Sequence, residues 1–415
     1  MENLFLDPTL IIILAGLIGF FMAFGIGAND VANAMGTSVG SKAITLKQAV
    51  IIAAIFEFLG AYFAGGEVTS TIRKGIVDPS IYSDDVNIFI IGMLSSLLAA
   101  GLWLLIASSK GWPVSTTHSI VGAIVGFVLI SKGASNVSWG TVGGIASSWI
   151  TSPLVSGLMA FLLYLSAKHL ILDRNNPTKA AVSVIPFYSF FVTAVICLVT
   201  ARKGLKHVGI NWTDNEIYLF TFVLSLLVSV FTFLFLLLKS SKLSSNVENQ
   251  FGILMIITAC AMAFAHGSND VANAIGPIAA VVSIVTSDGT IQTSSELNSW
   301  VLLLGAVGIV FGLAILGRHV IKTVGEKITT LTPSLGFSAN MATASTVLAA
   351  SYLGFPISTT HTLVGGVIGV GLARGCKYLD LNSIKRIFLS WIITIPVGAT
   401  FTILFYVILR LIFNV

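Results

Sequence analysis

The decamer GANDVANAMG at residues 27–36 returns as GSNDVANAIG at 267–276, with 8 of 10 positions identical. Each copy lies within a long apolar stretch, where amide and carboxylate side chains have no packing reason to occur. The polar residues of the two copies are Asn29, Asp30, Asn33, Asn269, Asp270 and Asn273. Polar residues at membrane depth are costly and usually mark a substrate or ion pathway. The duplicated polar patch is therefore the candidate site.

The composition is that of an integral membrane protein. Of 415 residues, 55% are hydrophobic and 9% are charged, with a mean hydropathy of +0.96, whereas a soluble domain carries roughly 25% charged residues. The net charge of +5 resides in short loops facing anionic lipid and does not indicate a nucleic-acid partner. The three cysteines are scattered and predict neither a disulfide framework nor a metal site. The first apolar run is expected to be a retained helix, because MENLFLD lacks the basic residues of a secretory signal.

The chain is predicted to be all-α, a polytopic membrane protein with about 12 transmembrane segments. Each apolar run is long enough for most or all of a bilayer-spanning helix, about 20 residues. The expected segments are 9–36, 43–65, 87–109, 113–131, 139–167, 181–200, 216–238, 251–283, 299–321, 334–353, 356–373 and 384–413.

Further landmarks show that the duplication covers most of the chain. PVSTTHSIVGAIVG at 113–126 returns as PISTTHTLVGGVIG at 356–369, and a Trp followed by a Pro also recurs. We therefore expect a first repeat at 1–170, two linking helices at 171–250 and a second repeat at 251–415. Seven segments, an odd number, precede the second repeat, so it enters the membrane from the opposite side. Such inverted-topology repeats are a common plan of secondary transporters.

The loop charges predict the orientation. Loops on the side opposite the N-terminus hold 15 of the Lys and Arg residues, against 7 on the other side. The positive-inside rule then puts the first side in the cytoplasm and both termini outside. The two segments that carry PVSTTH and PISTTH either span the membrane or re-enter it, and the sequence leaves both arrangements open.

The first motif is suited to cations. Gly25 and Gly27 are expected to weaken the helix just before Asn29, and a break at membrane depth frees backbone groups for ions. Asp30 and Asp270 are natural cation ligands or proton carriers. The alternative is helix–helix packing by small residues and Asn, which a carboxylate in both copies disfavours.

The second motif is suited to an anion. Proline favours the first turn of a helix, so the hydroxyls that follow it gather at an N-terminus, where unpaired N–H groups attract oxyanions. These residues are Ser115, Thr116, Thr117, Ser358, Thr359 and Thr360. Plain N-capping, the alternative, requires only one hydroxyl. His118 and His361 are predicted to make structural hydrogen bonds within the bundle and to support the site in that way.

Together the motifs predict an oxyanion accompanied by cations, because a dianion beside two carboxylates is strongly repelled in a low dielectric. Na+ and H+ both meet this requirement. Glu57 is a further expected cation ligand, and Asn340 is polar in the corresponding part of the second half. The expected oxyanion ligands are Ala28, Asn29, Ser115, Thr116, Thr117, Ser268, Asn269, Ser358, Thr359 and Thr360. The expected Na+ ligands are Asp30, Asn33, Glu57, Asp270 and Asn273.

These residues resemble the PiT family of inorganic phosphate transporters. The resemblance is carried by GANDVANAMGTSVGS at 27–41, TIRKGIVD at 71–78, AHGSNDVANAIGP at 265–277, TPSLGFSANMA at 332–342 and the two STTH segments. It implies cation-coupled symport of phosphate, and it matches Asp30, Glu57 and Asp270 to residues important for transport in relatives. Eukaryotic members often carry Glu at the position of Asn340, taken here as the counterpart of Glu57. They also carry a large central domain where this chain has a short loop around 239–250, so the chain resembles a minimal prokaryotic member.

The leading hypothesis is a Na+-coupled phosphate importer in the cell membrane, working by alternating access without a cofactor and without enzymatic activity. The resemblance also includes H+-coupled or metal-phosphate carriers and sulfate permeases, and an anion channel is a remoter alternative. Transporters of this type are often homodimers, and the sequence offers no interface motif that identifies one.

Overall fold

The computed structural model describes all residues except 1–3, 205–211, 240–245, 292–296 and 328–329. The described part consists of helices and loops, with one isolated β-bridge between Val77 and Val137. The helices of the first half are α1 (Pro8–Gly40), α2 (Leu46–Ala64), α3 (Gly66–Ser70), α4 (Val86–Ser109), α5 (Thr116–Ser131) and α6 (Trp139–Ala167). The all-α prediction is confirmed. The short central loop expected around 239–250 falls partly outside the described residues.

Two linking helices follow, and then the second half. The linking helices are α7 (Pro177–Val199) and α9 (Asp214–Lys239). The second half contains α10 (Glu248–Asp270), α11 (Ala272–Thr286), α12 (Ser299–Ile315), α13 (Arg318–Lys327), α14 (Pro333–Tyr352), α15 (Thr359–Arg374) and α16 (Leu381–Phe413).

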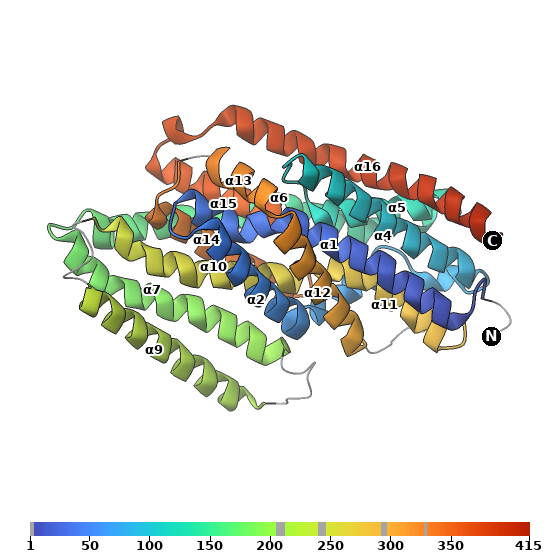
Figure 1. Ribbon diagram of the computed structural model, residues 1–415, viewed down its shortest axis with the longest axis horizontal. Helices are drawn as coiled ribbons and strands as arrows, with labels where there is room; N and C mark the ends of the chain where they lie inside the picture. The colour runs from blue at the N-terminus through green and yellow to red at the C-terminus, as the bar shows by residue number, and fades with distance from the viewer. Residues whose placement is uncertain (1–3, 205–211, 240–245, 292–296, 328–329) are drawn as a thin grey trace.

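The helices form a multi-pass bundle with both termini at one end (Figure 1). Eight helical stretches in the described part of the chain are long and apolar enough to cross a membrane. α1 runs away from the end that carries the termini, whereas α10 and α11 run back toward it (Figure 1). The first helices of the two repeats therefore point in opposite directions, as an inverted repeat requires.

The segments that carry PVSTTH and PISTTH form the returning arms of two hairpins, α4–α5 and α14–α15. The outer ends of the first hairpin lie together, because Tyr82 and Ser131 share a hydrogen bond of 2.6 Å. The tips of the two hairpins meet at the centre, where the Thr117 hydroxyl donates to the Ile357 carbonyl at 3.0 Å. The Thr360 hydroxyl donates to the Val114 carbonyl at 3.2 Å in return. Hairpins that meet tip to tip favour re-entry of these segments over a full crossing.

The glycines of the first motif bring helices together and do not break one. α1 is continuous from Pro8 to Gly40, so the expected break before Asn29 is wrong. A Cβ atom at Gly27 would lie 1.9 Å from the Ile309 carbonyl oxygen, and one at Gly267 would lie 2.2 Å from the Glu57 carbonyl oxygen. Only glycine permits such close backbone contact. In the second copy, the helix is interrupted at Val271, after Asp270 and not before it.

Candidate functional site

Four ionisable side chains from three helices meet at the centre of the bundle. His266 on α10 lies between the carboxylates, with Nδ1 3.2 Å from Glu57 Oε2 on α2. Its Nε2 lies 3.0 Å from Asp270 Oδ2, one turn along α10, and 3.8 Å from Asp30 Oδ2 on α1. The structure thus brings together Asp30, Glu57 and Asp270, which the sequence placed in one cation site.

The sequence analysis missed His266. Its spacing of four residues before Asp270 was the available signal, since residues i and i+4 of a helix share a face. The search relied on duplication, and His266 is not duplicated, because its equivalent in the first copy is Ile26.

The cluster is buried and carries an excess of acid. The side chains of His266, Asp30, Glu57 and Asp270 are at most 1% exposed. Both carboxylate oxygens of Asp30 and Oδ1 of Asp270 have no hydrogen-bond partner among the residues that the structure describes. Buried charges are normally paired or coordinate a metal ion. The unpaired oxygens therefore fit a cation held between Asp30 and Asp270.

The two repeats differ at this cluster. The approach of Gly267 to Glu57 matches that of Gly27 to Ile309, so Ile309 is the structural counterpart of Glu57. The assignment of Asn340 to that role is wrong. Asn340 lies on α14, where it accepts a hydrogen bond from the Thr37 hydroxyl at 2.5 Å and donates to Ser38 at 3.3 Å. It joins α14 to the end of α1 and does not enter the cluster, because a different helix corresponds to α2.

Two asparagines connect each repeat to the hairpin tip of the other. Asn33 Nδ2 donates to the Thr359 and Thr360 hydroxyls at 3.2 and 2.9 Å. Asn273 Nδ2 likewise donates at 3.3 Å to each of the first two threonine hydroxyls of the first tip. Thr359 in turn donates to Asp270 Oδ2 at 2.6 Å. Anion donors and cation ligands are thus in direct contact, and the amide oxygen of Asn273 has no partner among the described residues.

Other predicted oxyanion ligands have local partners. Ser115 and Ser358 cap α5 and α15, because their hydroxyls accept hydrogen bonds from the backbone N–H groups three residues later. The Ser268 hydroxyl donates to Ala265 O in its own helix at 2.8 Å. Ala28 is fully buried. These groups shape the ends of the helices around the site.

Asn29 and Asn269 connect the ND motifs to the hairpin turns. Asn29 Nδ2 donates to Trp112 O at 2.9 Å, and its Oδ1 accepts from Val114 N at 3.2 Å. Asn269 Nδ2 donates to the hydroxyl of Ser351 at 3.0 Å. Each amide therefore fixes the position of the hairpin turn that leads into an STTH segment.

The two histidines of the STTH segments make the structural hydrogen bonds that were predicted. His118 Nδ1 lies 3.2 Å from Trp391 O, and His361 Nδ1 lies 3.1 Å from Trp149 O. Their rings pack against each other with centroids 4.4 Å apart. The duplicated tryptophans thus hold both tips at the centre of the molecule.

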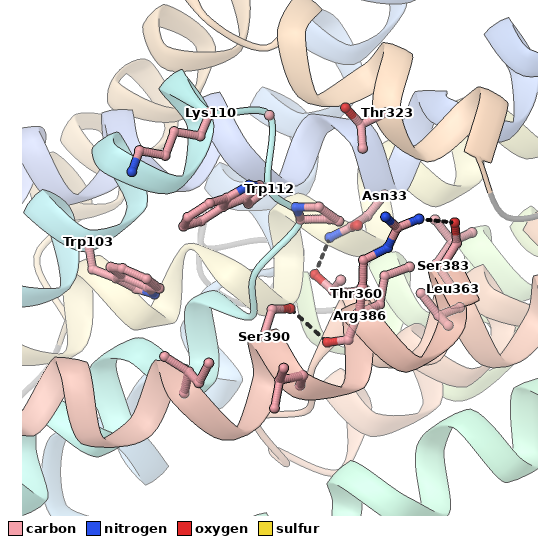
Figure 2. A pocket seen from close by; sticks show the side chains of 16 residues that line it. Asn33, Trp103, Lys110, Trp112, Thr323, Thr360, Leu363, Ser383, Arg386 and Ser390 are labelled. Carbon is pink, nitrogen blue, oxygen red and sulfur yellow. Dashed lines mark hydrogen bonds between the residues drawn. The ribbon is translucent and has the colours of Figure 1, made fainter. Parts of the chain in front are cut away.

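A cavity of about 620 Å³ reaches the site between the C-terminal end of α4 and the N-terminal half of α16 (Figure 2). Asn33 and Thr360 form part of its lining, and Thr323 on α13 lies near its rim. On the other side the equivalent threonine, Thr71, donates to Gly354 O at 2.8 Å and ties the second hairpin turn to the outer helices. The cavity therefore lies on the Thr323 side of the site, and the Thr71–Gly354 hydrogen bond lies on the other side.

Comparisons with known proteins agree with this arrangement. Residues 26–402 match the Phosphate transporter family. A protein of Haemophilus influenzae named "Putative phosphate permease" is 51% identical, over 97% of each chain. A protein of Arabidopsis thaliana named "Inorganic phosphate transporter 2-1, chloroplastic" is 42% identical, over 94% of this chain and 70% of its own.

A solved structure titled "The sodium-dependent phosphate transporter" is also similar. It is 43% identical, with a TM-score of 0.87 over 97% of this chain and 99% of its own. These relatives are named as transporters and permeases, and not as enzymes. The chain belongs to the Phosphate transporter family.

Proposed function

We propose that the chain imports inorganic phosphate by symport with Na+ across the cell membrane, with both termini outside. The observation that carries this proposal is the buried group of Asp30, Glu57 and Asp270 beside the hydroxyl-rich starts of α5 and α15. An oxyanion there is repelled by the carboxylates unless cations enter with it. The coupling of phosphate entry to cation entry is then a consequence of electrostatics.

The residues take different parts. The Thr116, Thr117, Thr359 and Thr360 hydroxyls and the amides of Asn33 and Asn273, most of whose donors are engaged in central hydrogen bonds in this structure, turn their donors to phosphate when it binds. Asp30 and Asp270 hold Na+ at the carboxylate oxygens that have no hydrogen-bond partner among the described residues, and the Asn273 amide oxygen adds a neutral ligand. Glu57 orients His266 toward both aspartates.

Alternating access follows from the contacts that differ between the two sides. The Thr71–Gly354 hydrogen bond closes the outer side, whereas Thr323 bonds weakly within α13, to His319 O at 3.5 Å, beside the open cavity. In the state that is open to the other side, the contact at Thr323 is closed and the contact at Thr71 is open. The two repeats, 1–170 and 251–415, move about the central hairpin tips.

The test is uptake of labelled phosphate by purified protein in liposomes, with the Na+ gradient, the proton gradient and excess sulfate varied independently. Na+-driven, saturable uptake that resists sulfate is expected. Uptake driven equally by protons without Na+ would contradict Na+ coupling. Asp30→Asn and Asp270→Asn should each abolish coupled uptake, while Asp288→Asn, in an exposed loop, serves as the control.

One observation favours a second candidate, symport with H+. His266 is an imidazole within contact distance of two carboxylates, and histidine readily carries a proton at physiological pH. The proton-gradient arm of the same assay separates this candidate from Na+ coupling.

A further inference from the structure

The cavity that reaches the site contains an arginine that the transport scheme above does not use. Arg386 stands on the first turns of α16, is exposed to the solvent side, and lines the cavity together with Asn33 and Thr360. Figure 2 shows its guanidinium turned into the part of the cavity that holds these two residues. Its Nη2 donates to the Ser383 hydroxyl at 3.2 Å, which leaves most of its five N–H donors for another acceptor.

A second cation stands at the rim of the same cavity. Lys110, at the end of α4, places its ammonium group 4.8 Å from the centroid of the Trp112 ring. The tryptophan face holds the lysine at the rim by a cation–π contact. The lining therefore changes from neutral donors at the inner end to two positive side chains farther out.

These two charges are absent from the equivalent positions of the other repeat. When the repeats are aligned at Trp149 and Trp391, Gly144 falls at the position of Arg386. When they are aligned at the two STTH motifs, Leu353 falls at the position of Lys110. The repeats share their central hydrogen bonds but differ here. Positive residues are in excess in the loops of this side, and Arg386 and Lys110 differ from adjacent Lys385 in that they line the cavity.

We propose that Arg386, assisted by Lys110, forms a second oxyanion site that receives phosphate between the central site and the mouth of the cavity. This inference rests on the proposed function, because the central site must hold phosphate first. A guanidinium binds a phosphoryl group through two parallel hydrogen bonds, and a positively lined cleft concentrates anions. Phosphate that leaves the neutral donors Asn33 and Thr360 thus passes to the positively charged Arg386 before it reaches bulk water.

The direct test measures each face of the transporter separately. In inside-out membrane vesicles, the cavity side is expected to face the medium, and the half-saturating phosphate concentration for Na+-driven uptake is determined there. Arg386→Gln should raise this concentration about tenfold, as expected when a charge-assisted hydrogen bond is lost. In right-side-out vesicles, the same variant should change it less than about twofold.

The matched control is Lys385→Gln, which removes the same charge from the adjacent, exposed residue that does not line the cavity. Arg386→Lys should recover part of the affinity, because a point charge replaces the two-pronged donor. Equal behaviour of Arg386→Gln and Lys385→Gln, or an equal effect on both faces, would overturn the inference. Absence of Na+-driven uptake by the unmodified protein would instead refute the proposed function.

A second measurement needs no variant and identifies the source of the phosphoryl group. Phenylglyoxal modifies arginine, and mass spectrometry of detergent-solubilised protein can follow Arg386 against the exposed Arg174 as an internal reference. Inorganic phosphate should slow the modification of Arg386 and not that of Arg174. Protection by phosphatidylglycerol in mixed micelles, without protection by inorganic phosphate, would assign the site to a lipid headgroup and overturn the proposal.

Discussion

Replacing Gly267 with alanine tests whether the ion cluster depends on the close approach of α10 and α2. The new Cβ would lie 2.2 Å from Glu57 O and 3.0 Å from Ala61 N. Ordinary van der Waals contact begins at 3.4 Å, so the helices must separate by about 1.2 Å at this point. The ion-pair contact between His266 Nδ1 and Glu57 Oε2, now 3.2 Å, then lengthens to roughly 4 Å, where the attraction between the two charges is weaker.

The magnitude follows from two opposing effects. Overpacking a tight interface costs about 1–3 kcal/mol, and alanine returns about 1 kcal/mol through its higher helix propensity. The obstructing atoms are backbone, which cannot rotate away, so we expect a net loss of roughly 1–2 kcal/mol. Because misplacing a functional group by 1 Å can cost about 100-fold in rate, the loss of Na+-driven uptake should be larger than the loss of stability suggests.

The assay combines thermal unfolding in detergent with initial phosphate uptake in liposomes. Gly252→Ala is the matched control, since it lies in the same helix and its Cβ would meet nothing within 4 Å. That variant should be as stable as the parent or slightly more stable, with normal uptake. If Gly267→Ala behaved like Gly252→Ala in both measurements, the reasoning from helix approach would be wrong.

Two further predictions use the differences between the repeats. His266→Ile leaves the buried Glu57 carboxylate without its ion-pair partner, which typically costs about 3–5 kcal/mol. Glu57→Ile should cost less, because His266 keeps its contact with Asp270. The double variant, which copies the symmetry-equivalent apolar positions Ile309 and Ile26, should unfold at a higher temperature than either single variant. Strictly additive effects of the two substitutions would count against a direct interaction between Glu57 and His266. Thr71→Val removes the hydrogen bond to Gly354 and should speed hydrogen exchange of the peptide that carries Gly354 by about two- to tenfold. Thr323→Val is its control, and an equal effect of both variants in mass spectrometry would contradict a closure specific to one side.

The sequence predicted the fold and the centre of the site because duplication is visible in the residues themselves. The two ND motifs and the two STTH motifs identified the helices and hairpin tips that meet in the structure. Their spacing also identified the four threonines that contact Asn33 and Asn273.

Features that one repeat alone possesses were missed or misassigned. His266 has Ile26 as its counterpart and Arg386 has Gly144, so neither is marked by repetition. The role of Gly27 was misread because a glycine in a helix is equally consistent with a break and with close packing, and only the position of the neighbouring backbone separates them. Asn340 was misassigned because it lies on α14, whereas the counterpart of α2 is α12, which carries the apolar Ile309 at the position of Glu57.

The unequal halves of the ion cluster also determine the energy of the empty carrier. In a transporter with two identical halves, the states that open to either side are the same structure turned over, and they are equally populated. The Glu57–His266 contact joins the two repeats, and the equivalent contact positions, Ile309 and Ile26, are apolar, which removes this equality. Each 1.4 kcal/mol of difference shifts the ratio of the two states tenfold. Substitutions in one copy alone can thus adjust the direction in which the unloaded protein rests, while the shared binding residues stay unchanged.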